Sequence, residues 1–173
     1  MKITKDELIK NINNVQAGDK IYLSGVIYTA RDAAHKRIVA ALNSGGETPF
    51  ELNGAAIYYC GPSPARPGSV IGACGPTTSA RMDAFTPRIL AEGVKILIGK
   101  GARSKEVAEA IKKNKAVYLI ATGGVAALLS KTVKKANLAA FKDLGPEAVY
   151  KLEVENMPLT VAVDANGKNI FNR

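Results

Sequence analysis

Three short stretches of the chain each gather cationic and hydroxyl side chains directly after a segment that predicts a β-strand. Arginine grips a planar carboxylate with both prongs of its guanidinium, while lysine and hydroxyl groups donate to the remaining oxygens. These residue types therefore predict a binding site for a carboxylate or a phosphate. The three stretches contain Arg31, Asp32 and His35, then Thr77, Thr78 and Arg81, and finally Lys100 and Ser104.

The spacing inside each stretch supports a shared site. Residues four apart lie on one face of a helix, and this is the separation of Arg31 from His35 and of Thr77 from Arg81. Lys100 stands between two glycines, which allow a ligand to approach the backbone closely. Single residues of these types also serve as helix caps, and a lone histidine is commonly a hydrogen-bonded structural residue.

Five segments rich in β-branched and apolar residues predict the strands that position these side chains. Ligands of open α/β sheets bind outside the carboxyl ends of the strands, where helix N-termini present free N–H groups. The predicted strands are residues 21–30, 55–60, 69–74, 94–99 and 116–122.

Capping residues and helical periodicity predict the elements between the strands. Thr4 and Glu7 form a capping box, and the tail over residues 148–171 alternates like strands around a hairpin turn at Asn166 and Gly167. The chain is therefore predicted to be one α/β domain, residues 1–173, with a mixed sheet, flanking helices and a C-terminal β-hairpin. The predicted helices span residues 5–13, 33–46, 79–93 with a kink near Pro87, 104–114 and 124–141.

Composition limits the class of protein. The chain has 173 residues, 47% of them hydrophobic, which suits one domain with its own core, and no apolar run reaches membrane-spanning length. The N-terminus lacks the apolar region of a signal peptide, and two cysteines without a CxxC pair favour the reducing cytoplasm. The formal charge of +9 lies largely in lysine runs typical of solvated helix faces.

Cys60 and Cys74 are expected to be buried and to act as small apolar residues. An iron–sulfur cluster generally needs three or four thiolates, so this chain is expected to hold no metal itself. Lys100 is followed by glycine instead of serine or threonine, so its stretch is not a Walker A motif.

Taken together, the blocks "SGVIYTARDAAHKRI", "GPTTSARMD" and "IGKGARS" resemble the β subunit of the two-subunit iron–sulfur hydro-lyases, the class I fumarases and L(+)-tartrate dehydratases. The segments "YCGPSPARPG" and "VENMPLTVAVDANG" extend the resemblance over nearly the whole chain. It implies a swivelling β/β/α-type domain that closes against a cluster-bearing α subunit. The implied activity is reversible hydration of fumarate to (S)-malate, or dehydration of tartrate to oxaloacetate.

The resemblance also implies which residues hold the C4 dicarboxylate. By matching position, Arg31, Arg81 and Lys100 are expected to bind the substrate carboxylates. Thr78 and Ser104 are expected to hydrogen-bond the substrate or to hold the turn.

For the chemical step, the resemblance implies that Thr77 is the base that takes a proton from the carbon next to a carboxylate. A threonine hydroxyl is a poor base, so it needs a cationic setting. Asp32 and His35 are expected to support this step, with His35 orienting water or substrate.

The cofactor and partner follow from the same resemblance. A 4Fe–4S cluster is expected on three cysteines of the α subunit, within an α2β2 heterotetramer, and the general acid is expected on the α subunit as well. No membrane or nucleic-acid partner is implied.

Alternatives remain at this point. Fumarate is favoured over tartrate because fumarases occur more broadly, not because of any particular residue. A different class of function is a non-catalytic anion-binding domain, against which the intact Thr77, Arg81 and Lys100 argue. Another is nucleic-acid binding through the lysine-rich faces, which would weaken steeply with salt.

Overall fold

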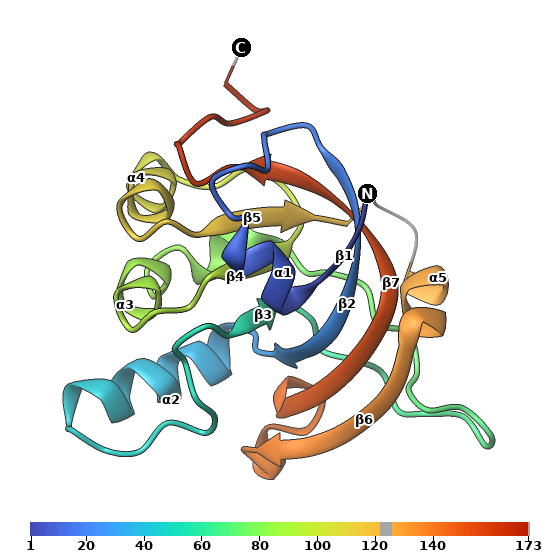
Figure 1. The fold of residues 1–173 in the computed structure, drawn as a ribbon. Helices are drawn as coiled ribbons and strands as arrows, with labels where there is room; N and C mark the ends of the chain where they lie inside the picture. Colours follow the sequence, from blue (N-terminus) through green and yellow to red (C-terminus); the bar gives the residue numbers. More distant parts are fainter. Residues whose placement is uncertain (122–125, 173) are drawn as a thin grey trace.

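The sheet of this protein has seven strands and curls until the second and seventh strands along the chain pair with each other. The computed structural model describes residues 1–121 and 126–172. The strand order is β1-β2-β3-β4-β5-β7-β6 (Figure 1). The strands are β1 (Lys2–Thr4), β2 (Lys20–Thr29), β3 (Ala56–Tyr58), β4 (Ile96–Gly99), β5 (Val117–Ile120), β6 (Val133–Ala140) and β7 (Val149–Val163).

The pairing of β2 with β7 closes a ring of five strands, β2, β3, β4, β5 and β7. The contacts among β2, β3, β4 and β5 are parallel, whereas β7 runs antiparallel to β2, β5 and β6. The register between β2 and β7 shifts at Gly25, whose φ of 129° suits glycine, and such a bulge sharpens the curl of a strand. The predicted α/β fold with a mixed sheet and flanking helices is confirmed.

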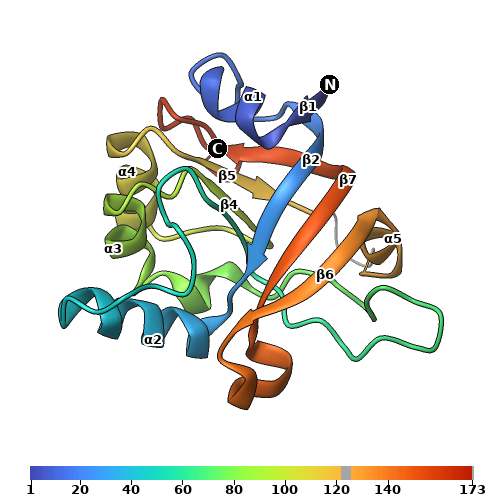
Figure 2. The same ribbon diagram turned by 60° about the horizontal axis from the view of Figure 1, so that its bottom comes forward.

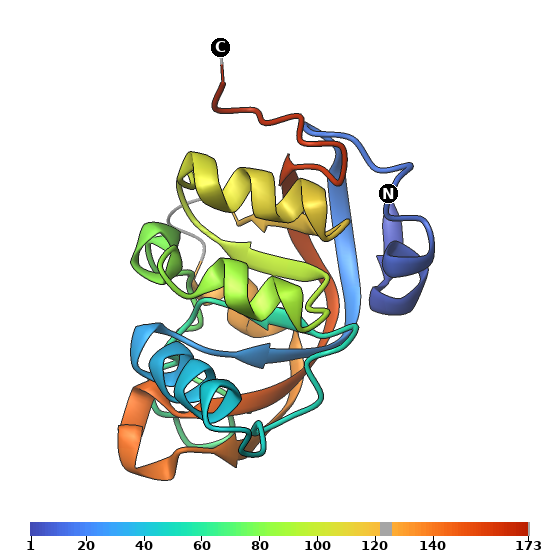
Figure 3. The same ribbon diagram turned by 90° about the vertical axis from the view of Figure 1, so that its left-hand side faces the viewer.

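Helices α2, α3 and α4 lie side by side against the outer face of the parallel strands, while α1 lies on the other side (Figure 3). No helix of the described residues is long and apolar enough to cross a membrane. The helical elements are α1 (Lys5–Lys10), α2 (Asp32–Asn43), α3 (Thr86–Ala91), α4 (Lys105–Lys113) and α5 (Ala126–Thr132), with 3-10 helices η1 (Ser79–Met82) and η2 (Lys142–Glu147).

Two hydrophobic cores result from the alternation of side chains along the strands. In β3, Ala56 and Tyr58 face the core inside the ring, and Ile57 faces the core under the helices. Every residue of β3 and β4 is buried, which is characteristic of parallel strands covered on both faces. The strands that carry the candidate site are therefore held from both sides.

Two of the predicted elements are wrong. A single helix was predicted over residues 124–141, but α5 ends at Thr132 and β6 follows as an edge strand paired with β7; residues 122–125 lie outside the described part. Lysine and alanine favour a helix there, and pairing with β7 overrides that local preference. The predicted strand over residues 69–74 is irregular backbone.

Two other predictions hold only in outline. The predicted kink in residues 79–93 is a complete break into η1 and α3, with Pro87 in the first turn of α3, where proline fits. The turn at Gly167 forms, with φ of 89°, but its hairpin is reduced to a single bridge between Val163 and Asn169. The C-terminal strand β7 instead forms its hydrogen bonds with β2 and β5 of the ring and with the edge strand β6.

Candidate functional site

The segment Thr77–Ser79 inserts between the carboxyl ends of β3 and β4. The backbone N–H of Thr77 donates to the Tyr59 carbonyl at 2.7 Å, and that of Ser79 donates to the Lys100 carbonyl at 3.0 Å. Thr78 and Lys100 form a parallel bridge. These contacts bring Thr77, Thr78 and Lys100 together at one edge of the sheet, as the sequence predicted for strand ends.

A buried serine locks this segment in place. Ser79 Oγ accepts a hydrogen bond from the Lys100 N–H at 2.9 Å. It donates its own hydrogen to the Tyr118 hydroxyl oxygen at 2.8 Å, because the Tyr118 hydrogen goes to the Gly101 carbonyl, also at 2.8 Å. A Cβ on Gly99 would lie only 2.0 Å from Ser79 Oγ, so no other residue fits at this position without displacing the segment. The glycine before Lys100 therefore serves the packing of Ser79.

Arg31 joins this edge from the neighbouring strand. It follows β2 as the N-cap of α2, and Ala30 N–H donates to the Tyr58 carbonyl, which places Arg31 beside the end of β3. Its guanidinium lies between two carboxylates, with Nη2 3.6 Å from Asp32 Oδ1 and Nε 3.5 Å from Glu147 Oε1.

These separations are too long for hydrogen bonds. Arg31 Nε, Asp32 Oδ1 and Glu147 Oε1 are buried atoms without a hydrogen-bond partner among the described residues. Buried polar atoms are normally satisfied, so this cluster has unused capacity for a ligand or ordered water. Glu147 was missed by the sequence analysis, because it reaches Arg31 from a distant part of the chain.

His35 lies in the core instead of on the open edge. It is fully buried, and its Nδ1 lies 2.8 Å from the Arg31 carbonyl, which can only accept, so Nδ1 carries the proton. Burial lowers the pKa of His35 to about 4, and the charge of Arg103 adds to the effect of burial. The ring packs against Tyr59 and Phe85. His35 is therefore neutral at pH 7 and fixes the backbone that carries Arg31.

Two arginines near η1 have different environments. Arg81 is an exposed residue of η1, close after Thr78. Arg103 is buried: its Nε donates to Asp83 Oδ1 at 2.7 Å, and its Nη2 donates to Thr86 Oγ1 at 2.8 Å. Its guanidinium also lies 5.1 Å from the centre of the Tyr59 ring. Arg103 and Asp83, which the sequence analysis did not single out, hold the break between η1 and α3.

The hydroxyl of Ser104 is engaged as the cap of α4, accepting from the Val107 N–H at 3.2 Å. Its own N–H donates to Asp83 Oδ2 at 2.8 Å. The second role considered for Ser104, holding the local turn, is the one that these contacts favour. Its contact with substrate stays a prediction.

The structure thus brings the predicted residues together to different degrees. Arg31, Thr77, Thr78 and Lys100 form a row along the carboxyl ends of β2, β3 and β4, and Arg81 follows in η1. We call these five residues the cationic row. Asp32 lies beside the Arg31 guanidinium, and His35 contacts the Arg31 carbonyl. Ser104 lies at the start of α4.

Cys60 and Cys74 are buried neighbours, with their sulfur atoms 3.4 Å apart. The hydrogen bond between the thiols and burial raise the pKa of Cys60, which keeps it a thiol. Among the described residues, no group of three or more His, Cys, Asp or Glu side chains is placed to hold a metal ion. These residues do not fit an iron–sulfur cluster, and the two cysteines are the buried apolar residues that were predicted.

Comparison with known proteins gives the family. Residues 1–173 match the family described as Fumarase C-terminus. A protein of Methanocaldococcus jannaschii with the provisional name L(+)-tartrate dehydratase subunit beta is 43% identical, over 98% of this chain and 88% of its own length.

Two proteins of Escherichia coli strain K12 are also similar. The L(+)-tartrate dehydratase subunit beta is 32% identical, over 94% of this chain and 82% of its own length. The aerobic class I fumarate hydratase is 33% identical over 96% of this chain, which spans only 31% of that enzyme. The chain belongs to the Fumarase C-terminus family, in which class I fumarate hydratases and β subunits of L(+)-tartrate dehydratase both occur.

Proposed function

We propose that this chain is the β subunit of a two-subunit iron–sulfur hydro-lyase that reversibly converts fumarate to (S)-malate. The observation that carries the proposal is the cationic row, in which the backbone bonds of Thr77 and Ser79 set two threonines beside Lys100. Arg31 lies at the end of the neighbouring strand, next to the end of β3. Membership of the family supports the reaction class.

Binding of the diacid is assigned to the cations of the row. Arg31, Arg81 and Lys100 would hold the two carboxylates, with Thr78 donating from its hydroxyl. The positive charge keeps a bound diacid ionised. It also stabilises the negative charge that develops beside a carboxylate when the neighbouring C–H bond breaks.

Proton transfer is assigned to Thr77. In the dehydration direction, Thr77 Oγ1 acts as the alkoxide: it takes the proton from the carbon next to a carboxylate and becomes the hydroxyl. The C–H electron pair becomes the new C=C bond. The hydroxyl on the adjacent carbon leaves with its C–O electron pair, takes up a proton from an acid on the partner subunit, and departs as water. Lys100, beside Thr78, lowers the cost of a negative charge on the Thr77 oxygen. Asp32 and His35 act as positioning residues through Arg31.

The cofactor is assigned to another polypeptide. Two buried cysteines are too few for a 4Fe–4S cluster, so we place the cluster on an α subunit, within an α2β2 heterotetramer. The names of the β-subunit relatives support the existence of such a partner.

Dehydration of L(+)-tartrate to oxaloacetate is the second candidate. It is favoured by the Methanocaldococcus jannaschii relative, which this chain matches at 43% identity over 88% of that protein. The two Escherichia coli relatives do not separate the candidates, because they are 33% and 32% identical.

Coexpression with the α-type subunit of the same organism tests the proposal. The complex, purified without oxygen, is assayed on fumarate, (S)-malate and both tartrates, and we expect turnover of fumarate and malate. The isolated chain is expected to turn over none of them. Turnover by the isolated chain, or a cluster-loaded complex inactive on every diacid, would contradict the assignment.

A further inference from the structure

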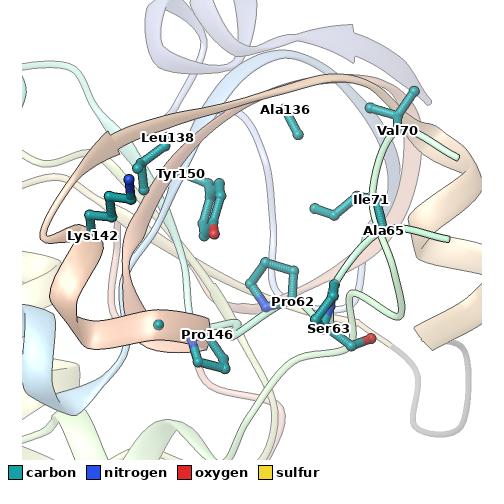
Figure 4. Close-up of a pocket in the computed structure, with 12 residues that line it drawn as sticks. Pro62, Ser63, Ala65, Val70, Ile71, Ala136, Leu138, Lys142, Pro146 and Tyr150 are labelled. Carbon is teal, nitrogen blue, oxygen red and sulfur yellow. The ribbon is translucent and has the colours of Figure 1, made fainter. Parts of the chain in front are cut away.

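A groove of about 410 Å³ lies between the loop that follows β3, the edge strand β6 and η2 (Figure 4). Its lining is mostly apolar, and of the described residues that line it, Lys142 alone is charged. The apolar lining includes Pro62, Val70, Ile71, Leu138, Pro146 and Tyr150.

The rim of this groove exposes large apolar side chains to solvent. Val70 is 50% exposed and Leu138 is 45% exposed. Leu138 belongs to β6, which is the last strand of the sheet and pairs only with β7. An edge strand with an exposed apolar rim is characteristic of a surface that another polypeptide covers.

The loop that forms one wall is fixed at its base, although it extends away from the body of the protein (Figure 2). Ser63 N–H donates to the Ala73 carbonyl at 3.0 Å, and Gly72 N–H donates to the Ser63 carbonyl at 3.2 Å. A Cβ on Gly72 would lie 2.4 Å from the carbonyl oxygens of Ser63 and Pro64, so the two sides of the loop touch. The groove is preformed, which reduces the entropy cost of binding.

The groove shares a wall with the cationic row. A Cβ on Gly61 would lie 3.1 Å from Arg31 Cδ and 3.0 Å from the Pro146 carbonyl oxygen. Pro62 and Pro146 line the groove, and Glu147, next along the chain, is paired with Arg31. A polypeptide bound in the groove would therefore contact Pro146, the residue before Glu147, which pairs with Arg31.

We propose that the groove docks an apolar segment of the cluster-bearing subunit, with an acidic residue placed to pair with Lys142. This inference rests on the proposed function, because that function places the remaining catalytic groups on a partner that must lie against the cationic row. In the fumarate hydratase of Escherichia coli this domain makes up 31% of the chain, so a much larger body of the same polypeptide accompanies it. Among the described residues, the groove is an apolar surface contiguous with the row, and this continuity favours the catalytic partner over a second copy of the chain.

The test compares charged substitutions on the rim in the coexpressed complex. Leu138→Asp and Val70→Asp are each expected to weaken the binding of the α-type subunit at least about 10-fold, because apolar anchors dominate such interfaces. Tyr22→Asp is the matched control: Tyr22 is 45% exposed and pairs with Pro158, which lies eight residues along β7 from the groove residue Tyr150, or ~26 Å along the strand. It should bind as the unaltered chain does. Thermal unfolding of each isolated variant shows whether it is folded.

Hydrogen exchange provides a second readout that does not depend on a substitution. Amides of residues 62–72 and 133–142 are expected to gain protection in the complex, and those near Tyr22 are not. Unchanged binding by both rim variants, or unchanged exchange in both segments, overturns the docking site even if the complex is active. Self-association of the isolated chain that both rim variants abolish also overturns it, in favour of a second copy. A complex that forms through the groove but turns over no diacid refutes the proposed function alone, and failure of the unaltered chain to bind the α-type subunit refutes both.

Discussion

At the scale of single residues, replacing Thr77 by valine removes the hydroxyl and keeps the shape of the side chain. Because the segment is anchored by the backbone of Thr77 and Ser79, the fold should be unaffected. A base acts in the transition state, so kcat of the complex should fall by about 100-fold or more while KM changes little. Steady-state kinetics with malate measure both constants, and near-normal turnover would remove Thr77 from the mechanism.

Arg81→Met addresses binding instead of chemistry. Arg81 is exposed on η1, and among the described residues its side chain makes no hydrogen bond or ion pair like those of Arg103, so its loss should leave stability unchanged. Losing a charge-assisted contact to a carboxylate should raise KM about 10- to 100-fold. Arg81→Lys, which keeps the charge and loses the fork, should fall in between; an unaltered KM in Arg81→Met would contradict the assignment.

The sequence predicted these residues unevenly, and the reason is the distance along the chain to their partners. The burial of the two cysteines could be foreseen, because lone cysteines are usually buried. His35 was expected to orient water or substrate, and its full burial is a feature that the sequence did not predict. Glu147 and Arg103 could not be foreseen, because each acquires its role from a contact with Arg31 or Asp83 that only the folded chain creates. Charged residues in a basic chain give no signal that distinguishes a buried pair from a solvated one.

At the scale of elements, the position of the segment Thr77–Ser79 between β3 and β4 depends on Gly99. In Gly99→Ala the new methyl group would meet Ser79 Oγ at 2.0 Å and Tyr59 Cδ2 at 2.7 Å. We expect the free energy of unfolding to fall by about 2–3 kcal/mol and diacid turnover to be lost, because the segment must shift. Gly46→Ala is the control, since its nearest neighbours lie at 3.5 Å, and it should be nearly neutral in urea unfolding.

His35 connects α2 to the segment before α3 and makes stability depend on pH. Its folded pKa of about 4 lies below its ordinary 6.5, so between these values the unfolded chain binds the extra proton. Its contribution to stability is therefore present above pH 6.5 and is lost as the pH falls toward 4, by about 3 kcal/mol in total. In His35→Phe this part of the pH dependence should disappear in urea titrations between pH 4 and 7; an unchanged slope would refute the low pKa.

The elements themselves were predictable where the local pattern and the tertiary environment agree. The buried strands β4 and β5 and the capped helix α4 are such cases, because their apolar runs and the Ser104 cap favour the structures they adopt. Residues 133–140 are the opposite case, since a helix-favouring composition is held as an edge strand by β7. No pattern within those residues carries that information.

At the scale of the whole molecule, the pairing of β2 with β7 ties the two cores to each other. β7 contributes Val154 and Leu159 to the core inside the ring, and Val149 and Val163 to the core beneath the helices. Neither core is complete without this strand, so the chain should unfold in one cooperative step.

Coincidence of two probes checks this expectation. Far-UV circular dichroism and the fluorescence of the six tyrosines, in a chain that has no tryptophan, should give the same urea midpoint. Separate midpoints would show that the ring and the helical layer unfold independently.

The backbone anchoring of Thr77–Ser79 also has an evolutionary consequence. Main-chain groups of Thr77 and Ser79, together with the buried Ser79 hydroxyl, hold the segment Thr77–Ser79. For the described residues, the Thr78 side chain makes no capping bond. Mutations at positions 77 and 78 can therefore alter reactivity while the scaffold beneath persists. Proteins that inherit this framework can therefore come to act on different, related diacids without any change in the ring of five strands.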